Sequence, residues 1–435
     1  MGGAVRDVVM GLDPHDYDLA TDALPDEMLN IFPKSVSVGA KFGTVMALIQ
    51  DSHGETMEVE VRWPTNVEFV KEIDKDLGRR DFTFNAMAID LTNMEWDGGD
   101  DLKEVEIYDP FGGVKDIELK KIRAVGTPLE RFKEDGVRAF KACRLASQLN
   151  FEIDEETFKA ISECVPVAAQ VSMERIRDEF MKMLLRSSKP SVGIDLMRKA
   201  GLLQLFMPEL LEGIGVEQKM FHSDDVYWHS LRTCDSAHDS VKLAALLHDI
   251  AKPRTDMGNG HFYGHDAMGA QMVEEILRRM KFPQAEVKRV VLLIKNHMFY
   301  YPHMEDGMTE EEKQNIELHE WTDSAVRRFI QRVGIENIDD LFKLRLADAQ
   351  SNPMTAFKPE EITLLQKRIS AVLQEDMALK VSDLKISGED LVGIGIERGP
   401  QLGKILKELL DMVLEDPMVN TKDKLIENAK KLANI

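Results

Sequence analysis

A change of pattern near residue 129 constrains the fold of this chain more than any other feature of its sequence. Before it, short alternating stretches predict strands, at 16–20 and in a hairpin of 43–50 with 55–62. After it, apolar residues recur almost without interruption at the spacing of amphipathic helices. We therefore expect an α+β fold, in which a small mixed head precedes a long all-α body.

The composition excludes several classes of protein. The chain has 77 acidic and 55 basic residues, a net charge of -22, so any surface that binds nucleic acid must be local. Cys143, Cys164 and Cys234 are far apart and form neither a disulfide framework nor a zinc motif, which favours a reducing cytoplasm. No apolar run approaches membrane-spanning length, so we expect no membrane partner. The oligomeric state stays open.

Two carboxylates stand two residues apart in the stretch Asp16-Tyr17-Asp18. On a strand, side chains at i and i+2 share a face, so Asp16 and Asp18 are expected to point the same way. Converging carboxylates repel each other unless a cation lies between them, and Mg²⁺ prefers such oxygen ligands together with substrate phosphates. A lone Asp-x-Asp is more often a solvated turn. Here its neighbours favour phosphoryl or nucleotidyl transfer with two metal ions.

These neighbours suit a triphosphate. Gly2-Gly3 permits close approach of the backbone to phosphate, and Arg6 follows one helical turn later. Further on, "RRDFTFNAMAID" supplies Arg79 and Arg80, whose guanidinium groups match phosphate oxygens, and Asn85, which is placed to reach a ribose. The two arginines would otherwise form a solvated pair of charges, but three separate elements favour the same ligand.

Together, the stretches "GGAVRD", "DYDLAT", "RRDFTFNAMA", "YDPFGG" and "RFKEDGVRAFKACRLASQLNF" resemble the class II tRNA nucleotidyltransferases, a family of CCA-adding enzymes and bacterial poly(A) polymerases. The resemblance covers nearly the whole chain, and "LKISGEDLVGIGIERGPQLGKILKELLDMVL" looks like the C-terminal region of the family. It implies a polymerase-beta-like nucleotidyltransferase head, an all-α neck, an HD-type body and a helical tail. The corresponding domains are expected at 1–112, 113–175, 176–350 and 351–435.

The resemblance also implies the roles of single residues. It assigns Mg²⁺ and catalysis to Asp16 and Asp18, and contacts with the nucleotide to Gly3, Arg6 and Arg80. CTP and ATP are then the expected nucleotide substrates, and the 3′ end of tRNA is the expected partner.

The stretch Glu134-Asp135-Gly136-Val137-Arg138 matches the segment with which the family reads the incoming base. Asp135 and Arg138 are three residues apart, so we expect them to be neighbours on one helix face. Asp135 can accept from the amino group of cytosine or adenine while Arg138 donates to the adjacent ring nitrogen. Uracil and guanine present the reverse order. The plainer alternative is a surface ion pair. Lys141 and Arg144 follow where the family usually has arginines, and Lys141 lacks the planar fork of an arginine.

Two departures from the family pattern concern the head. Met1 directly precedes Gly2, where the family has a further strand that would support the head sheet. The segment between Arg62 and Val67 is short, where the family has a longer flexible loop that helps the site switch from adding C to adding A. A short loop resembles enzymes that add only the two cytidines, so complete CCA addition and CC addition both stay open.

The helical body holds a second constellation, which consists of His229, His248-Asp249 and Asp348. The order H…HD…D resembles the HD-domain metal phosphohydrolases and predicts an HD domain at about 225–350. Neutral imidazoles with carboxylates suit a divalent transition metal whose bound water attacks phosphate, such as a 2′,3′-cyclic phosphate on a damaged RNA end. His265 and His297 would extend the site to a second metal ion. The alternative is a degenerate HD fold that serves only as scaffold.

The leading hypothesis is a tRNA nucleotidyltransferase that adds C and A, or only CC, without a nucleic-acid template. A poly(A) polymerase is less favoured, because the tail does not stand out as basic. Two hypotheses from other classes are an HD phosphohydrolase whose head only binds tRNA, and a tRNA-binding protein with no chemistry. Asp16, Asp18 and Arg80 argue against the last.

Overall fold

The computed structural model describes most of the chain and divides it into two compact units. The described residues are 1–14, 17–21, 23, 25–32, 34–36, 44–50, 56–62, 73–91, 105–218, 225–258, 261–299, 301, 321–352, 359–374 and 379–435. The first unit runs from Met1 to Pro208 and the second from Glu209 to Ile435. The finer boundaries expected at 112, 175 and 350 stay predictions.

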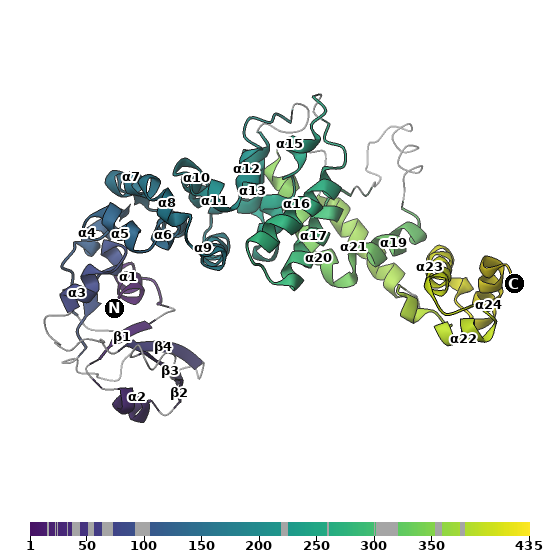
Figure 1. The fold of residues 1–435 in the computed structure, drawn as a ribbon, viewed down its shortest axis with the longest axis horizontal. Helices are drawn as coiled ribbons and strands as arrows, with labels where there is room; N and C mark the ends of the chain where they lie inside the picture. The colour runs from purple at the N-terminus through teal and green to yellow at the C-terminus, as the bar shows by residue number, and fades with distance from the viewer. Residues whose placement is uncertain are drawn as a thin grey trace. The chain divides into compact units, whose positions relative to one another are not determined.

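The head is built on a four-stranded sheet in the order β1-β4-β3-β2 (Figure 1). Its strands are β1 Tyr17–Ala20, β2 Ser35–Val36, β3 Thr44–Gln50 and β4 Thr56–Arg62. β3 and β4 are antiparallel, which confirms the predicted hairpin, although its turn lies outside the described residues. β1 is an edge strand parallel to β4, and Asp18 stands opposite Glu60 in the register.

Alternation along the strands buries one face of this sheet. Val45 and Ala47 of β3 and Val59 and Val61 of β4 are at most 3% exposed and pack together. Helix α2 (Pro25–Ile31) covers them with Met28, which is fully buried. The edge strand β1 is thereby held on a packed layer, and Asp18 is held with it.

The rest of the head consists of short elements that surround the start of the chain (Figure 1). These are α1 Gly3–Val9, α3 Ile73–Gly78, η2 Thr83–Asn85, β5 Ala88–Ile89, β6 Ile107–Tyr108, α4 Gly113–Glu118 and β7 Lys121–Ile122, which pairs with β8 Glu152–Ile153. Helix α1 begins at Gly3, because Gly2 adopts a φ of 71° and turns the chain into the helix.

The neck contains two helices where the base-reading stretch predicted one helix face. Helix α5 (Pro128–Glu134) ends before Asp135, which has extended backbone (φ -155°, ψ 105°), and α6 (Val137–Leu149) begins two residues later. The break occurs at Gly136, where a Cβ would lie 2.9 Å from Ala168 Cα. The prediction that Asp135 and Arg138 share one helix face is therefore wrong.

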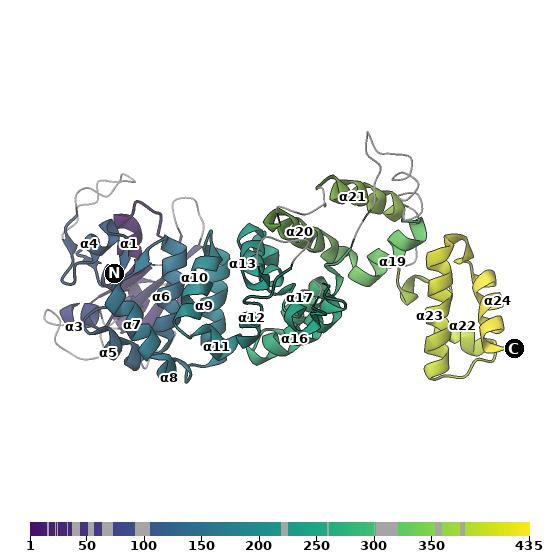
Figure 2. The same cartoon turned by 90° about the horizontal axis from the view of Figure 1, so that it is seen from above.

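Helix α6 is the centre of the neck. In Figure 2 it lies beside α9 (Met173–Arg186) and α10 (Pro190–Lys199), with which it packs. The remaining elements of the first unit are α7 Glu155–Glu163, α8 Val165–Ala168 and α11 Leu203–Phe206. Because α6 is covered from several sides, eight of its residues between Ala139 and Ser147 are buried, instead of the single face that its periodicity predicts.

The second unit is entirely helical in the part that the structure describes. Its longer elements are α13 Val226–Ser236, α14 Lys242–Leu247, α15 Lys252–Thr255, α16 His265–Arg279, α17 Gln284–Asn296, α19 Asp323–Val333, α20 Ile335–Ser351, α21 Pro359–Leu373, α22 Gly388–Gly393, α23 Pro400–Glu415 and α24 Lys422–Ala433. Its shorter elements are α12 Pro208–Leu211, η3 Asp239–Val241, η4 Val381–Asp383 and η5 Pro417–Val419. The buried Arg327 donates to the Leu414 carbonyl at 3.1 Å and so joins α19 to the end of α23. Among the described helices, none is both long and apolar enough to cross a membrane.

A glycine-to-alanine pair tests the packing of the neck. In Gly193→Ala, the new Cβ would overlap Met183 Sδ and lie 2.9 Å from the Cys143 carbonyl, so we expect a loss of about 1–3 kcal/mol in unfolding free energy. In Gly403→Ala, the Cβ meets nothing within 4 Å on an exposed helix, so we expect a gain of about 1 kcal/mol. Urea denaturation measures both. A stable Gly193→Ala variant would contradict the tight approach of α10 to α6.

Candidate active sites

The start of α1 and the residues after α3 form a polar cluster beside β1. The Gly2 N–H donates to the Met87 carbonyl at 3.0 Å. A Cβ on Gly2 would overlap the Arg80 guanidinium and lie 3.3 Å from Asp18 Oδ2. Arg80 Nη1 itself is 3.5 Å from that carboxylate oxygen. Glycine is therefore required for an arginine and a carboxylate to lie this close to the first turn of α1.

A chain of polar contacts joins this cluster to the neck. Arg6 Nη1 donates to Asn85 Oδ1 at 3.0 Å, and Asn85 Nδ2 donates to Asp81 Oδ1 at 3.0 Å. The other oxygen of Asp81 forms an ion pair with Lys141 Nζ. Elements α1, η2 and α6 are thus held in one arrangement, which brings the predicted residues Arg6 and Lys141 into a single network.

Asp81 is the buried charge in this network, with 8% of its surface exposed. Burial alone would raise the pKa of its carboxyl, but the Lys141 ammonium and hydrogen bonds from Asn85 and the Phe82 N–H hold that pKa below its ordinary value. Asp81 is therefore ionised at neutral pH, and its ion pair with Lys141 is present there. Asp81 belongs to the stretch "RRDFTFNAMAID", which the sequence indicates for a triphosphate, but nothing in that stretch indicates this supporting role.

The two residues that the sequence predicts to read the base are separated by the break in the helix and are held by different partners. Asp135 Oδ1 accepts from the Val137 N–H at 3.2 Å, and Asp135 Oδ2 accepts from Arg175 Nη2 at 2.7 Å. Arg138 donates to the carbonyls of Arg131 (2.9 Å) and Arg79 (3.0 Å). Arg138 thus lies beside the segment that leads into Arg80 and Asp81.

The remaining predicted head and neck residues divide into three cases. Gly3 lies in the first turn of α1, where a Cβ would stand 3.6 Å from Arg6 Nη2. Arg144 is buried and pairs with Glu179 at 2.7 Å, so among the described residues its contacts do not join it to the other predicted nucleotide-binding residues. Asp16 and the short segment after Arg62 lie outside the described residues.

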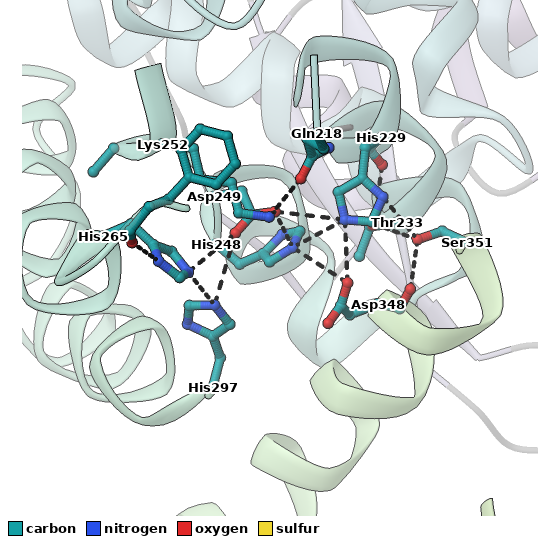
Figure 3. Close-up of polar contacts among 12 residues, drawn as sticks. Gln218, His229, Thr233, His248, Asp249, Lys252, His265, His297, Asp348 and Ser351 are labelled. Carbon is teal, nitrogen blue, oxygen red and sulfur yellow. Dashed lines mark hydrogen bonds and ion pairs between the residues drawn. The ribbon is translucent and has the colours of Figure 1, made fainter. Parts of the chain in front are cut away.

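Six side chains converge in the HD region of the second unit (Figure 3). They are His229 on α13, His248 and Asp249 directly after α14, His265 at the start of α16, His297 directly after α17 and Asp348 on α20. The ligand atoms of His229, His248 and Asp348 lie within 4.8 Å of one another, and so do those of Asp249, His265 and His297. The structure therefore brings together all four predicted HD residues and both predicted additional histidines.

Asp249 presents one carboxylate oxygen to each half of this cluster. Its Oδ2 lies 3.1 Å from His248 Nε2 and 3.6 Å from His229 Nε2. Its Oδ1 lies 3.5 Å from His265 Nε2 and 3.8 Å from His297 Nε2. Ligand atoms at about 2.1 Å from an ion stand about 3.0–3.5 Å apart, so these separations fit two neighbouring cation positions that share Asp249.

The backbone fixes the histidines with Nε2 toward the carboxylates. The Nδ1 atoms of His248, His265 and His297 each bond to the carbonyl three residues earlier, at 2.8, 2.7 and 2.6 Å. A carbonyl can only accept, so Nδ1 carries a proton in each ring, and Nε2 is the atom that can offer a lone pair to a metal. His229 Nδ1 lies 3.4 Å from Ser351 Oγ.

The charges at this cluster favour a cation. Burial alone would lower the pKa of His248, but Asp249 and Asp348 raise it to about 10. Burial and the charge on His248 lower the pKa of His297 to about 4. Without a metal, one proton therefore resides at His248 between the carboxylates, while His297 stays neutral.

Two residues that the sequence analysis did not single out border Asp249. Lys252 Nζ lies 2.6 Å from Asp249 Oδ2 and donates to Gln218 Oε1 at 2.5 Å. The position of Lys252, three residues after Asp249, is a helical spacing that could have indicated this contact. Nothing in the sequence around Gln218 indicates that its side chain contacts Lys252 beside Asp249.

The fold and the two sites define a nucleotidyltransferase head followed by a helical chain that contains an HD domain. Three family profiles match the chain: "Poly A polymerase head domain" at 1–123, "Probable RNA and SrmB- binding site of polymerase A" at 150–213 and "HD domain" at 221–325. Nucleotidyltransferase heads and HD domains generally use divalent metal ions, which agrees with the donor sets above.

Whole-chain relatives identify the family. An A-adding tRNA nucleotidyltransferase of Deinococcus radiodurans is 32% identical over 94% of this chain and 90% of its own length. A CCA-adding enzyme of Lactococcus lactis is 28% identical over 99% and 92%. The CCA-adding enzyme of Bacillus stearothermophilus, solved in complex with CTP, matches with a TM-score of 0.66 and 25% identity over 100% of this chain and 94% of its own. The chain belongs to the tRNA nucleotidyltransferase and poly(A) polymerase family.

The Asp81–Lys141 pair predicts a pH-dependent stability. Because the folded-state pKa of Asp81 is lowered, its ionised form stabilises the fold above the unfolded pKa of about 3.9, and this contribution is lost as the pH falls through the folded-state pKa. Asp81→Asn should therefore cost about 2 kcal/mol at pH 7 and progressively less below about pH 4.

Urea denaturation at pH 7, 4 and 3 measures this deficit. Glu156→Gln, on the exposed side of α7, is the matched control and should stay within about 0.5 kcal/mol of the parent at each pH. A deficit that is constant or grows as the pH falls would contradict an ionised Asp81.

Proposed function

We propose that this chain adds C and A nucleotides from CTP and ATP to the 3′ end of tRNA, in the cytoplasm and without a nucleic-acid template. One observation carries the proposal: the network from Arg6 through Asp81 to Lys141 joins the residues expected at the triphosphate to the helix expected to read the base. The names of the relatives above, CCA-adding and A-adding enzymes, support this activity over a poly(A) polymerase.

At the triphosphate end, we assign Asp18 and Asp16 to hold Mg²⁺. The donor chemistry fits, because Asp18 supplies a partly exposed carboxylate, and its Oδ2 lies 3.5 Å from Arg80 Nη1 rather than in a close ion pair. When bound, Mg²⁺ neutralises phosphate charge and lowers the pKa of an attacking hydroxyl. Gly3, Arg6 and Arg80 place backbone N–H groups and guanidinium groups around the phosphates.

At the base end, Asp135 and Arg138 act as fixed polar groups that need not touch each other. Arg175 orients the carboxylate of Asp135, and the carbonyls of Arg79 and Arg131 orient Arg138. A cytosine or adenine satisfies an acceptor beside a donor. Uracil or guanine would leave both unpaired, and such a mismatch discriminates strongly.

Primer extension tests this activity. We expect tRNA that ends before C74 to gain C, C and A when CTP and ATP are supplied with Mg²⁺. A tRNA that ends after C75 should gain only A. Asp18→Asn should lower the rate about a thousandfold, because it removes a ligand for the charge-stabilising ion.

Asp13→Asn, an exposed carboxylate a few residues earlier, is the matched control and should transfer at the parent rate. Arrest after two cytidines would indicate a CC-adding enzyme and make the segment after Arg62 the cause to examine. Full transfer by Asp18→Asn would refute the site.

We propose metal-dependent hydrolysis of a phosphate ester as a second activity, located in the HD domain. The observation that favours it is the sharing of Asp249 between two sets of histidines with their lone pairs turned inward. Nitrogen-rich donor sets with carboxylates fit a divalent transition metal, and such an ion supplies hydroxide at neutral pH when bound. A 2′,3′-cyclic phosphate at an RNA end is the substrate class that we assign.

Metal stoichiometry tests the second site. The full chain, loaded with Mn²⁺ or Ni²⁺ and then desalted, should retain two ions. His265→Asn should retain about one, because His265 serves only the position on the Oδ1 side of Asp249. His238→Asn, a histidine on the exposed turn before α14, is the control and should retain two. Both variants should keep full nucleotidyl transfer, and a chain that retains no ion would reject the hydrolase.

A further inference from the structure

The contact of Gln218 with Lys252 leaves one buried donor without a partner at the edge of the HD cluster. Gln218 is 2% exposed, and its Oε1 accepts from Lys252 Nζ. Since a lysine can only donate, the amide nitrogen Nε2 is the free end of the side chain. Among the described residues, Gln218 Nε2 has no hydrogen-bond partner. A buried donor without an acceptor costs free energy, so a ligand that supplies an acceptor would gain binding free energy from this contact.

Backbone hydrogen bonds hold the Gln218 side-chain amide beside the cluster. The strand-like stretch that ends at Gln218 is tied to the start of α13: the Val226 N–H donates to the Val216 carbonyl at 3.1 Å, and Glu217 forms a bridge with Asp225. Helix α13 carries His229, and the stretch bonded to its start carries Gln218. The position of α13 therefore sets the places of both the amide and a predicted metal ligand. Figure 3 shows Gln218 above Lys252 and Asp249, on the same side of the cluster as His229.

Lys252 is the second donor of the pair. Its side chain is 12% exposed. The ammonium nitrogen Nζ lies 2.6 Å from Asp249 Oδ2 and 5.5 Å from the centre of the Phe262 ring. Asp249 and Gln218 account for two of its three N–H donors. The Gln218 nitrogen is bonded to the same carbon as the oxygen that contacts Lys252, so both donors can reach a single tetrahedral anion.

From this geometry we propose that Gln218 and Lys252 form the subsite that binds the phosphoryl group of the substrate, a proposal that rests on the HD hydrolase above. The two side chains donate to non-bridging phosphate oxygens on the Oδ2 side of Asp249, beside the cation position formed with His229, His248 and Asp348. They act by binding and orienting the substrate and are not metal ligands. The ligand class is a phosphate ester, and inorganic phosphate is its simplest probe.

Calorimetric titration of inorganic phosphate into the full chain tests the subsite, with the metal content measured on the same samples. Gln218→Glu keeps the acceptor for Lys252 and replaces the Nε2 donor with an anionic oxygen. It should weaken phosphate binding at least tenfold with unchanged metal content. Gln218→Leu, which adds no charge, should weaken binding several-fold. Gln271→Glu, on the exposed side of α16, is the matched control and should bind like the parent.

The head also attracts phosphate, so Arg80→Ala serves as the second comparison. Phosphate binding that survives in Arg80→Ala and is lost in Gln218→Glu belongs to the HD domain. Parent-like binding by a folded, metal-loaded Gln218→Glu or Gln218→Leu would overturn the subsite and leave the hydrolase standing. A parent chain that binds no metal would overturn the hydrolase and the subsite together, while nucleotidyl transfer would be unaffected.

Discussion

The first site depends on one buried carboxylate. Asp81 has little access to water and is kept ionised by Lys141, Asn85 and the Phe82 N–H. Lys141 belongs to α6 and Asn85 to η2, and Asn85 in turn accepts a hydrogen bond from Arg6 on α1, so the charge of Asp81 and its network join α1, η2 and α6. Burial of a charge costs free energy, and this cost is offset only when all of its partners are in place. The network therefore favours one arrangement of these elements over others. Arg6 at one end and Lys141 at the other then have little freedom to separate.

The side chains of the HD cluster are held in place by a different kind of contact. Three of its histidines, His248, His265 and His297, obtain their orientation from carbonyls three residues earlier in the chain, contacts that form with the local turn itself. The long-range element is Asp249, whose two oxygens serve two sets of donors. Local bonds therefore set the direction of these three rings, and packing of the helices sets the distances between them. His229 is the exception, because its Nδ1 lies 3.4 Å from Ser351 Oγ on α20, the helix that also carries Asp348. The contact of 3.1 Å between His229 and Asp348 thus depends on the packing of α13 against α20.

The sequence predicted what local patterns encode, and it failed where long-range contacts decide. The hairpin of β3 and β4 follows from alternation, and the HD residues follow from a spaced motif. The break at Asp135 was missed, because the helical period continues through it and only the approach of Gly136 to Ala168 reveals the need for a glycine. The ion pair of Asp81 with Lys141 joins residues sixty positions apart, a contact that no spacing rule contains. Gln218 is an ordinary glutamine in sequence, and only its burial and its unused amide distinguish it.

The donor chemistry also separates the two sites in their use of metals. The head offers carboxylate oxygen at the edge of a sheet, and the proposed Mg²⁺ would need the phosphates of a nucleotide to complete its coordination there. The body offers four imidazole nitrogens with two carboxylates, which hold a transition metal more strongly than any oxygen-only site of the same charge. Under the proposed assignment, the head would therefore acquire its ion together with the substrate, whereas the body would hold its ions in the absence of one. The two proposed metal-dependent reactions would then coexist in one chain without competition for the same cation.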